Sequence, residues 1–349
     1  MKILTVIGAR PQFIKAAAVS NVIRKKHTEI LIHTGQHYDQ NMSDVFFEEL
    51  GIPKPDYSLG IGSGGHGYQT GNMLIQLEEV FQKEKPDAVM VYGDTNSTLA
   101  GALCASKLLI PVAHVEAGLR SFNMNMPEEQ NRILTDHLSK YLFVPTGSAE
   151  ENLKNEGIKK GIYNVGDVMF DAILHFKKLA NTKEPLLEKL GLEKAKFILT
   201  TIHRAENTND INRLKNIVEA LNESNKTIVL PLHPRTAKYM KDYGLNFGSN
   251  IKLIDPIGYL QMIQLESNCE KIVTDSGGVQ KEAFFMKKPC ITMRDETEWV
   301  ETVKNGWNRI VGTDKDKILD SIVNFEAVEE QKPIFGDGKA SEKILKILG

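Results

Sequence analysis

Acidic and histidine side chains follow several of the short apolar segments of this sequence. Asp94 and Glu116 each come just after a run of β-branched residues, and Glu128 lies at the start of an expected helix. His203 and His233 end two later apolar runs. Carboxylates and imidazoles gathered at one place are the groups of general acid–base catalysis. Ordinary structural roles stay open, since Asp94 suits a helix N-cap, Glu128 favours a helix dipole, and a single histidine is more often structural.

Two segments have the composition of anion-binding turns. In the segment 8–15, GARPQFIK, free backbone N–H groups at a helix start and the cations Arg10 and Lys15 suit a diphosphate. Its spacing matches neither GxGxxG nor a P-loop, and a solvent-facing loop explains it equally well. The turn 276–278 (SGG) also precedes a helix, with Glu282 one turn further on, where a carboxylate suits a ribose diol. Together the two turns predict that the protein binds a nucleoside diphosphate. The acid–base groups predict proton transfer on the group that is attached to this diphosphate.

Charge and hydropathy exclude several partners. Lys and Arg total 43 against 45 Asp and Glu, for a net charge of −2, so neither nucleic acid nor a membrane surface is expected. No apolar stretch approaches the roughly 20 residues of a transmembrane helix. The first residues lack the pattern of a signal peptide, and we expect a cytoplasmic protein.

Cysteine spacing argues against metal sites and disulfides. Cys104, Cys269 and Cys290 lie far apart without a CxxC pair. His114 and Glu116 form an HxE pair as in zinc deaminases, but the PCxxC segment of those enzymes is missing, so no metal is expected. Alternation puts both side chains on one face of a strand, where one can orient the other.

The glycine-rich segment 60–67, GIGSGGHG, lacks the GK[ST] ending of a P-loop. It is interpreted as a mobile loop over a cleft, with a simple flexible connection as the alternative.

Short β-branched segments alternate with segments of helical periodicity, which predicts βαβ units and an α/β fold with mainly parallel sheets. The predicted strands are 2–7, 29–33, 88–92, 111–115, 141–144, 162–165, 197–202, 227–232, 251–254, 271–274 and 289–293. The predicted helices include 14–24, 70–82, 98–109, 128–139, 168–179, 211–221, 279–286 and 339–348. We expect two Rossmann-like doubly wound domains facing a cleft: residues 1–167, with a C-terminal helix (338–349) packing back on them, and residues 168–337.

Eight motifs spread over essentially the whole chain resemble the non-hydrolysing UDP-N-acetylglucosamine 2-epimerase family. They are GARPQFIK, GDTNSTLAG, HVEAGLRS, MPEEQNR, TIHRAEN, LPLHPR, TDSGGVQKEA and MRDETEW. The resemblance implies a glycosyltransferase-B architecture, no metal or nicotinamide cofactor, and a homodimer. It also implies inversion at C2 of a UDP-HexNAc, by anti elimination of UDP to a 2-acetamidoglucal and re-addition.

The resemblance assigns a role to each matching residue. The acid–base carboxylates would be Asp94, Glu116 and Glu128, with His203 facing the departing phosphate. The remaining matches are substrate contacts: Arg10 and Lys15 for diphosphate and sugar, His233 in the same cleft, Ser276, Gly277 and Gly278 as the phosphate-binding turn, and Glu282 on the ribose.

Several segments depart from the common enzymes of this family, among them GARPQFIK, SFNMNMPEE and TIHRAEN. Where those carry TTERPE, this chain has Glu296-Thr-Glu-Trp299-Val-Glu, and the variants resemble the subgroup acting on UDP-2,3-diacetamido-2,3-dideoxyglucuronate for surface polysaccharide. We expect that substrate over UDP-GlcNAc, because a changed pocket contact alters specificity more readily than mechanism. The candidate specificity residues are Arg132, Arg204, Arg294 and Trp299. The segment 35–38, GQHY, also differs from the common GQHR, which puts activation by a second UDP-GlcNAc in doubt.

Three other functions stay open on the same sequence. They are a UDP-sugar glycosyltransferase, a hydrolysing epimerase that releases the free sugar, and a non-catalytic UDP-sugar sensor. The joint presence of the three carboxylates favours an epimerase over the first and the last.

Overall fold

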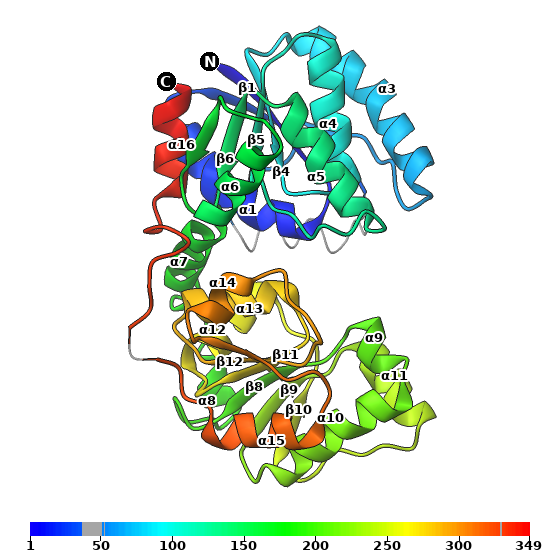
Figure 1. Cartoon of the computed structure of the whole chain (residues 1–349), viewed down its shortest axis with the longest axis vertical. Coiled ribbons are helices and arrows are strands. Elements are labelled where there is room, and N and C mark those ends of the chain that lie inside the picture. The colour runs from blue at the N-terminus through cyan, green and yellow to red at the C-terminus, as the bar shows by residue number, and fades with distance from the viewer. Residues whose placement is uncertain (37–50, 52, 329) are drawn as a thin grey trace. The chain divides into compact units, whose positions relative to one another are not determined.

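The computed structural model describes residues 1–36, 51, 53–328 and 330–349, which form two compact units (Figure 1). The first unit comprises Met1–His175 and Pro333–Gly349, and the second comprises Phe176–Lys332. The division falls inside helix α7 (Val168–Ala180).

A parallel sheet of seven strands, in the order β3-β2-β1-β4-β5-β6-β7, forms the centre of the first unit. Its inner strands are β-branched and buried; in β4, for example, every residue is buried. Such strands need helices on both faces of the sheet. The strands are β1 (Lys2–Ile7), β2 (Thr28–His33), β3 (Tyr57–Ser58), β4 (Ala88–Tyr92), β5 (Val112–Val115), β6 (Tyr141–Val144) and β7 (Ile162–Asn164). Besides α7, the helices are α1 (Arg10–Ile23), α3 (His66–Glu84), α4 (Asn96–Lys107), α5 (Pro127–Leu138), α6 (Gly147–Asn155) and α16 (Ala340–Leu348).

Helix α4 lies unusually close to this sheet, because it carries Gly101 where it crosses β1 and β4. A Cβ at this position would lie 2.9 Å from Cγ1 of Val91 and 3.4 Å from Cβ of Val6. Thr95, the N-cap of the helix, accepts a hydrogen bond from the N–H of Thr98. The start of α4 is therefore fixed immediately after Asp94.

The second unit repeats the arrangement with a parallel six-stranded sheet, in the order β10-β9-β8-β11-β12-β13. Its strands are β8 (Ile198–Thr201), β9 (Ile228–Pro231), β10 (Ile251–Ile254), β11 (Ile272–Thr274), β12 (Cys290–Thr292) and β13 (Asn308–Ile310). Its helices are α8 (Leu186–Lys189), α9 (Ala205–Thr208), α10 (Ile211–Glu223), α11 (Pro234–Asp242), α12 (Tyr259–Asn268), α13 (Gly277–Phe285), α14 (Val300–Lys304) and α15 (Lys315–Asn324).

Both sheets have a topological switch point at which the chain reverses its direction of progress. In the first unit it lies between β1 and β4, and in the second between β8 and β11. In open α/β sheets, ligands bind outside the carboxyl ends of the strands at such a point. The predicted segments 8–15 and 276–278, and the residues Asp94 and His203, all follow these four strands.

The prediction of an α/β fold with two doubly wound domains is confirmed. Each predicted strand is present, with ends that differ by at most one residue, while β3 and β13 were not predicted. The interpretation of 60–67 as a mobile loop is wrong for His66 and Gly67, which begin α3. The predicted cleft between the domains stays a prediction. Within the described part of the chain, no helix has the length and apolar character needed to cross a membrane.

The C-terminal helix α16 belongs to the first unit, where it packs against α1 and buries Ile344 and Leu348. Asp171 of α7 accepts hydrogen bonds from the backbone N–H groups of Ala340 (3.0 Å) and Ser341 (2.7 Å). These are N–H groups of a first helical turn, which have no partner within their own helix. Asp171 therefore caps α16 from a neighbouring helix.

Replacing this cap, Asp171→Ala, should destabilise α16 by about 1–2 kcal/mol, since a lost helix cap costs about that much. Hydrogen exchange of the α16 amides should then become roughly 5–30-fold faster. The matched control is Asp337→Ala, which removes only an exposed ion pair with Lys343 (2.9 Å) before the same helix. Equal exchange rates in the two variants would contradict the capping role.

Candidate active site

The loop between β1 and α1 is held by the side chain of Gln12. Its Oε1 accepts hydrogen bonds from the N–H groups of Gly8 (2.7 Å) and Ala9 (3.0 Å), and its Nε2 donates to the carbonyl of Tyr92 at the end of β4 (2.7 Å). The expectation that the N–H groups of this loop are free for an anion is therefore wrong for Gly8 and Ala9. Arg10 is the first residue of α1.

Glu116 lies just past β5 in a left-handed backbone conformation, with a φ of 72°. This conformation costs a non-glycine residue about 1–2 kcal/mol. It is held by the N–H groups of Glu116 and Ala117, which both donate to the carbonyl of Phe143 at 3.1 Å. The carboxylate forms an ion pair with Lys15 of α1, and both side chains lie against Gly93. Glu116 and Lys15 therefore lie beside Gly93, the residue that precedes Asp94 in the sequence.

Asp94 is paired with Arg132 of α5. Nη2 and Nε of Arg132 donate to Oδ2 of Asp94 at 2.6 and 3.0 Å, and Nη1 donates to Glu129 at 2.7 Å. Glu129 is buried and also accepts hydrogen bonds from two backbone N–H groups, those of residues 121 and 122. Of the two neighbouring glutamates at the start of α5, Glu129 is therefore structural, whereas Glu128 is exposed.

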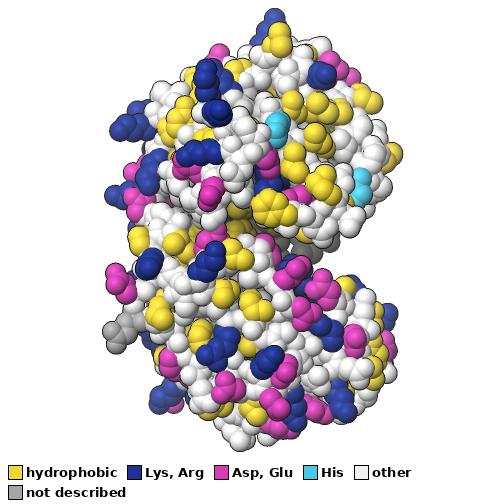
Figure 2. Space-filling view, in the orientation of Figure 1, with side chains coloured by type: hydrophobic (Ala, Val, Ile, Leu, Met, Phe, Trp, Pro, Cys, Tyr) yellow, Lys and Arg dark blue, Asp and Glu magenta, His cyan; other side chains and the backbone are white. Residues whose placement is uncertain are grey.

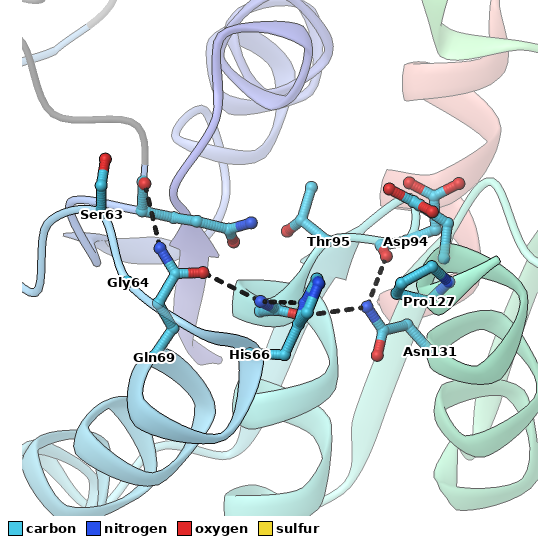
Figure 3. A pocket seen from close by; sticks show the side chains of 11 residues that line it. Ser63, Gly64, His66, Gln69, Asp94, Thr95, Pro127 and Asn131 are labelled. Carbon is cyan, nitrogen blue, oxygen red and sulfur yellow. Dashed lines mark hydrogen bonds between the residues drawn. The ribbon is translucent and has the colours of Figure 1, made fainter. Parts of the chain in front are cut away.

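A pocket of about 320 Å³ brings Asp94 and Glu128 together (Figure 3). Its lining consists of Gln36, Ser63, Gly64, His66, Gln69, Asp94, Thr95, Asn96, Pro127, Glu128 and Asn131. Nδ2 of Asn96 lies 2.9 Å from Oε1 of Gln69 and 3.1 Å from Nδ1 of His66, and Asn131 donates to the carbonyl of Asp94 (2.9 Å). Hydrogen-bonding side chains thus line the pocket from α3, α4 and α5.

Sequence reasoning missed the amide and imidazole groups of this pocket. The available signal for Gln36 is its position three residues after β2, and for His66 its position where the glycine-rich segment becomes a helix. Tyr38, which departs from the common family pattern, lies outside the described residues, as does His37.

In the second unit, Asp275 organises the end of β8. Its fully buried carboxylate accepts hydrogen bonds from the backbone N–H groups of His203 (3.0 Å) and Arg204 (3.0 Å), and from the side chain of Asn207 (3.2 Å). It also lies 3.1 Å from Nδ1 of His203. Burial alone would raise the pKa of Asp275, but the hydrogen bonds and charge of His203 and the backbone N–H groups outweigh it and lower the pKa. Asp275 was not among the predicted site residues.

His233 lies next to His203, with ring centroids 5.9 Å apart. Its Nδ1 accepts a hydrogen bond from the N–H of Arg235 (3.1 Å), so that it caps α11. Burial, followed by the charges of His203 and Arg235, lowers the pKa of His233. The ring is therefore neutral at pH 7, with its proton on Nε2.

The predicted phosphate-binding turn, Ser276–Gly278, forms the start of α13. Ser276 is the N-cap and accepts from the N–H of Val279 (3.4 Å). A Cβ at Gly277 would overlap Oε1 of Glu298, and Arg294 donates to the other oxygen of that carboxylate (2.7 Å). A carboxylate with its own arginine thus rests on the turn proposed for phosphate.

Glu282, expected on the ribose, is largely buried within the same helix. Its Oε1 accepts a hydrogen bond from the hydroxyl of Tyr259 (3.1 Å). Burial, and then the proximity of Glu282, raises the pKa of Glu266 well above its ordinary value. Burial beside Glu282 therefore favours the neutral form of Glu266.

The remaining specificity candidates of this unit are less exposed than expected. Trp299 is 9% exposed and lies under the ammonium group of Lys281, 4.1 Å from the ring centroid. Arg294, another candidate specificity residue, is 8% exposed and already pairs with Glu298. Arg204 is partly exposed at the N-cap of α9.

The charge on the visible face is mixed, with Lys or Arg and Asp or Glu interspersed over both units (Figure 2). On this face, therefore, the charges do not form a broad basic surface that would attract anions. Among the described residues, no three side chains of His, Cys, Asp or Glu gather in a way that could hold a metal ion.

The lowered pKa of Asp275 predicts a pH-dependent contribution to stability. Asp275→Asn should destabilise the second unit by about 1.5–3 kcal/mol at pH 7, because hydrogen bonds to a charged group are lost. Since the folded pKa lies below the ordinary value of 3.8, the difference from wild type should stay constant down to about pH 5. It should shrink as the pH falls through 3.8 towards the folded pKa.

Tryptophan fluorescence during urea unfolding measures this difference, because both tryptophans, Trp299 and Trp307, lie in the second unit. Asp295→Asn is the control, since Asp295 is 71% exposed and pairs with Arg213. A deficit in Asp275→Asn that grows on acidification would contradict the prediction.

Comparison with known proteins identifies the family of this chain. The family model described as UDP-N-acetylglucosamine 2-epimerase matches residues 21–349. A Methanococcus maripaludis protein named UDP-N-acetylglucosamine 2-epimerase homolog is 58% identical, over 100% of this chain and 99% of the relative. The UDP-2,3-diacetamido-2,3-dideoxy-D-glucuronate 2-epimerase of Pseudomonas aeruginosa is 55% identical, also over 100% of this chain and 99% of the relative.

A crystal structure of the Methanocaldococcus jannaschii UDP-GlcNAc 2-epimerase in complex with UDP-GlcNAc and UDP has a TM-score of 0.87 at 49% identity. The match covers 100% of this chain and 99% of that one. These enzymes have the two-domain, glycosyltransferase-B-like fold, as predicted from the sequence. The chain belongs to the UDP-N-acetylglucosamine 2-epimerase family.

Proposed function

We propose that this protein is an isomerase that inverts C2 of a UDP-linked 2-acetamido sugar. The observation that carries the proposal is that Asp94 and Glu128 line one pocket, while Glu116 follows β5, the strand that pairs with β4 before Asp94. A C2 hydrogen of such a sugar is not acidic, so its removal needs a positioned carboxylate. Membership of the 2-epimerase family supports the same reaction.

The reaction is an elimination followed by an addition. One carboxylate takes the C2 proton, the electrons of the C2–H bond form the C1–C2 double bond, and the C1–O bond breaks with its electrons on UDP. A proton is then delivered to the opposite face of C2, and the UDP oxygen bonds again to C1. Carboxylates on two sides of the sugar serve the two half-reactions. Two of these carboxylates are held by ion pairs, Asp94 by Arg132 and Glu116 by Lys15.

The second unit supplies groups for the leaving diphosphate. The N-terminus of α13, with Ser276 at its cap, is the proposed phosphate site, because the positive dipole end of a helix stabilises an anion. His203 is oriented by Asp275 through Nδ1, which leaves Nε2 to donate to the departing oxygen. His233 and Glu282 complete the proposed nucleotide contacts, together with Arg10 from the first unit.

We further propose UDP-2,3-diacetamido-2,3-dideoxyglucuronate as the substrate, with its mannuronate epimer as the product. The 55% identity to the Pseudomonas aeruginosa enzyme supports this choice, as does the segment that holds Glu298 and Trp299. UDP-GlcNAc is the second candidate, favoured by the 49% identity to the Methanocaldococcus jannaschii enzyme. Arg204, at the N-cap of α9, is the proposed partner of the sugar carboxylate because Arg294 already pairs with Glu298.

Incubation with each nucleotide in heavy water, followed by NMR, tests reaction and substrate together. Solvent deuterium should appear at C2 of the product, because the returning proton comes from a group that exchanges with solvent. The kcat/KM should favour the diacetamido-glucuronate nucleotide by at least about 10²-fold. A pocket built for the extra polar groups of this substrate has hydrogen-bonding groups that stay unpaired when a plain sugar binds.

The same experiment distinguishes the rival functions. Full retention of the original hydrogen at C2 would overturn the elimination route, and comparable kcat/KM values would assign UDP-GlcNAc as an equal substrate. Release of free sugar would identify a hydrolysing epimerase, and turnover only with an acceptor would identify a glycosyltransferase. Binding of both nucleotides without any turnover would identify a sensor. Light scattering of the same sample checks the expected homodimer.

Glu116→Gln should lower kcat by roughly 10²–10⁴-fold, because the amide can neither take nor return a proton. UDP affinity, measured by calorimetry, should stay equal or rise, since Lys15 loses its anionic partner. The control Glu151→Gln changes an exposed glutamate of α6 and should leave kcat unchanged. Near-normal turnover in Glu116→Gln would show that the catalytic cluster is wrongly assigned.

A further inference from the structure

His114 is fully buried in β5, and both of its ring nitrogens face hydrogen-bond acceptors. Nε2 lies 2.7 Å from the carbonyl oxygen of Gly93, and Nδ1 lies 2.7 Å from Oδ1 of Asp136. A carbonyl oxygen only accepts, so Nε2 carries a hydrogen. A neutral imidazole has a single N–H, and Nδ1 would then be left as an acceptor facing a carboxylate.

The surroundings of Asp136 favour its ionised form. Oδ2 accepts hydrogen bonds from the N–H of Gly118 (3.1 Å) and from Nη1 of Arg120 (2.7 Å). Nδ1 of His114 therefore also faces an anion, and a hydrogen on it satisfies both groups.

Arg120 extends this arrangement to a fourth group, because it also donates to both carboxylate oxygens of Glu156 (2.6 and 2.7 Å). With His114 protonated, the four side chains alternate in sign and their charges sum to zero. The side chains of His114, Asp136 and Arg120 are buried, and buried charges are tolerated when each is paired and hydrogen-bonded, as here.

This network connects the three elements that carry the proposed acid–base groups. The carbonyl bonded to His114 belongs to Gly93, the residue before Asp94, and Glu116 follows His114 by two residues in β5 and its turn. Asp136 lies in α5, the helix whose first turn bears Glu128. Figure 1 shows β4, β5 and α5 in the same part of the first unit.

We propose that His114 is a positioning residue that keeps both ring protons at neutral pH and, as an imidazolium, fixes the relative placement of Asp94, Glu116 and Glu128. Its catalytic meaning rests on the function proposed above, whereas its protonation state does not. This differs from the sequence expectation that His114 orients Glu116 directly, because its ring nitrogens contact Gly93 and Asp136 instead.

Nitrogen-15 NMR of the intact wild-type protein tests the protonation state directly. The His114 ring, assigned by its absence in His114→Gln, should show two protonated nitrogens with similar shifts between pH 6 and pH 9. In Asp136→Asn the anionic partner is gone, and the ring should become a neutral tautomer within this range. A neutral His114 ring in the wild-type protein at pH 7, with the shared proton on Asp136 or absent, would overturn the proposal.

Steady-state kinetics test the positioning role. His114→Gln keeps one donor but neither the charge nor the second donor. The kcat should therefore fall roughly 10–10²-fold while KM changes little, because a small misplacement of reacting groups lowers the rate of the chemical step. Asp136→Asn should give a similar fall, and the double variant should be no worse than either single one. His27→Gln, which changes another buried histidine of the same unit, should lose thermal stability without this fall in kcat.

The two measurements separate this inference from the proposed function. A doubly protonated ring in a protein without epimerase activity would refute the function and uphold the imidazolium. An active epimerase with a neutral ring, or with an unchanged kcat in a folded His114→Gln, would uphold the function and refute the positioning role.

Discussion

Every strand pair in the two described sheets is parallel, so the strands of each unit all deliver their carboxyl ends to one edge. Residues far apart in the sequence are brought together at that edge, such as Lys15 and Glu116, which lie 101 residues apart and form an ion pair. In the second unit the same constraint brings His203, at the end of β8, to Asp275, at the end of β11. The direction of the strands decides which residues meet, and side-chain contacts then decide how they are oriented.

A common device stabilises these edges in both units. A buried polar side chain accepts hydrogen bonds from backbone N–H groups of a neighbouring turn, which would otherwise be left without partners. Gln12 does this for the turn after β1, and Asp275 for the turn after β8. Asp136 does it for the turn after β5 through the N–H of Gly118. These three turns are thereby held by buried side-chain hydrogen bonds in addition to the strands that they follow.

The sequence predicted strands well where they are central and β-branched, because burial on both faces demands a continuous apolar run. It missed β3, of two residues, and β13, whose sequence Asn-Arg-Ile is mostly polar, since neither leaves such a run. Asp94, His203 and Ser276 could be predicted from their positions after strands. The partners Arg132 and Asp275 could not, because a contact between distant segments depends on the register and orientation of whole elements. The same limit explains the error at Gly8 and Ala9, whose N–H groups are taken by Gln12.

Gly101 shows how a residue remote from the chemistry can be as restricted as a reacting group. Because its missing side chain sets the spacing between α4 and the sheet, any larger residue would push the helix away from Val91 and Val6. The helix begins two residues after Asp94, so this shift would be passed to the carboxylate as a change in its height above the strand ends. Substitutions that keep the fold are therefore restricted in the body of α4. The side chains that line the pocket are not restricted by this packing.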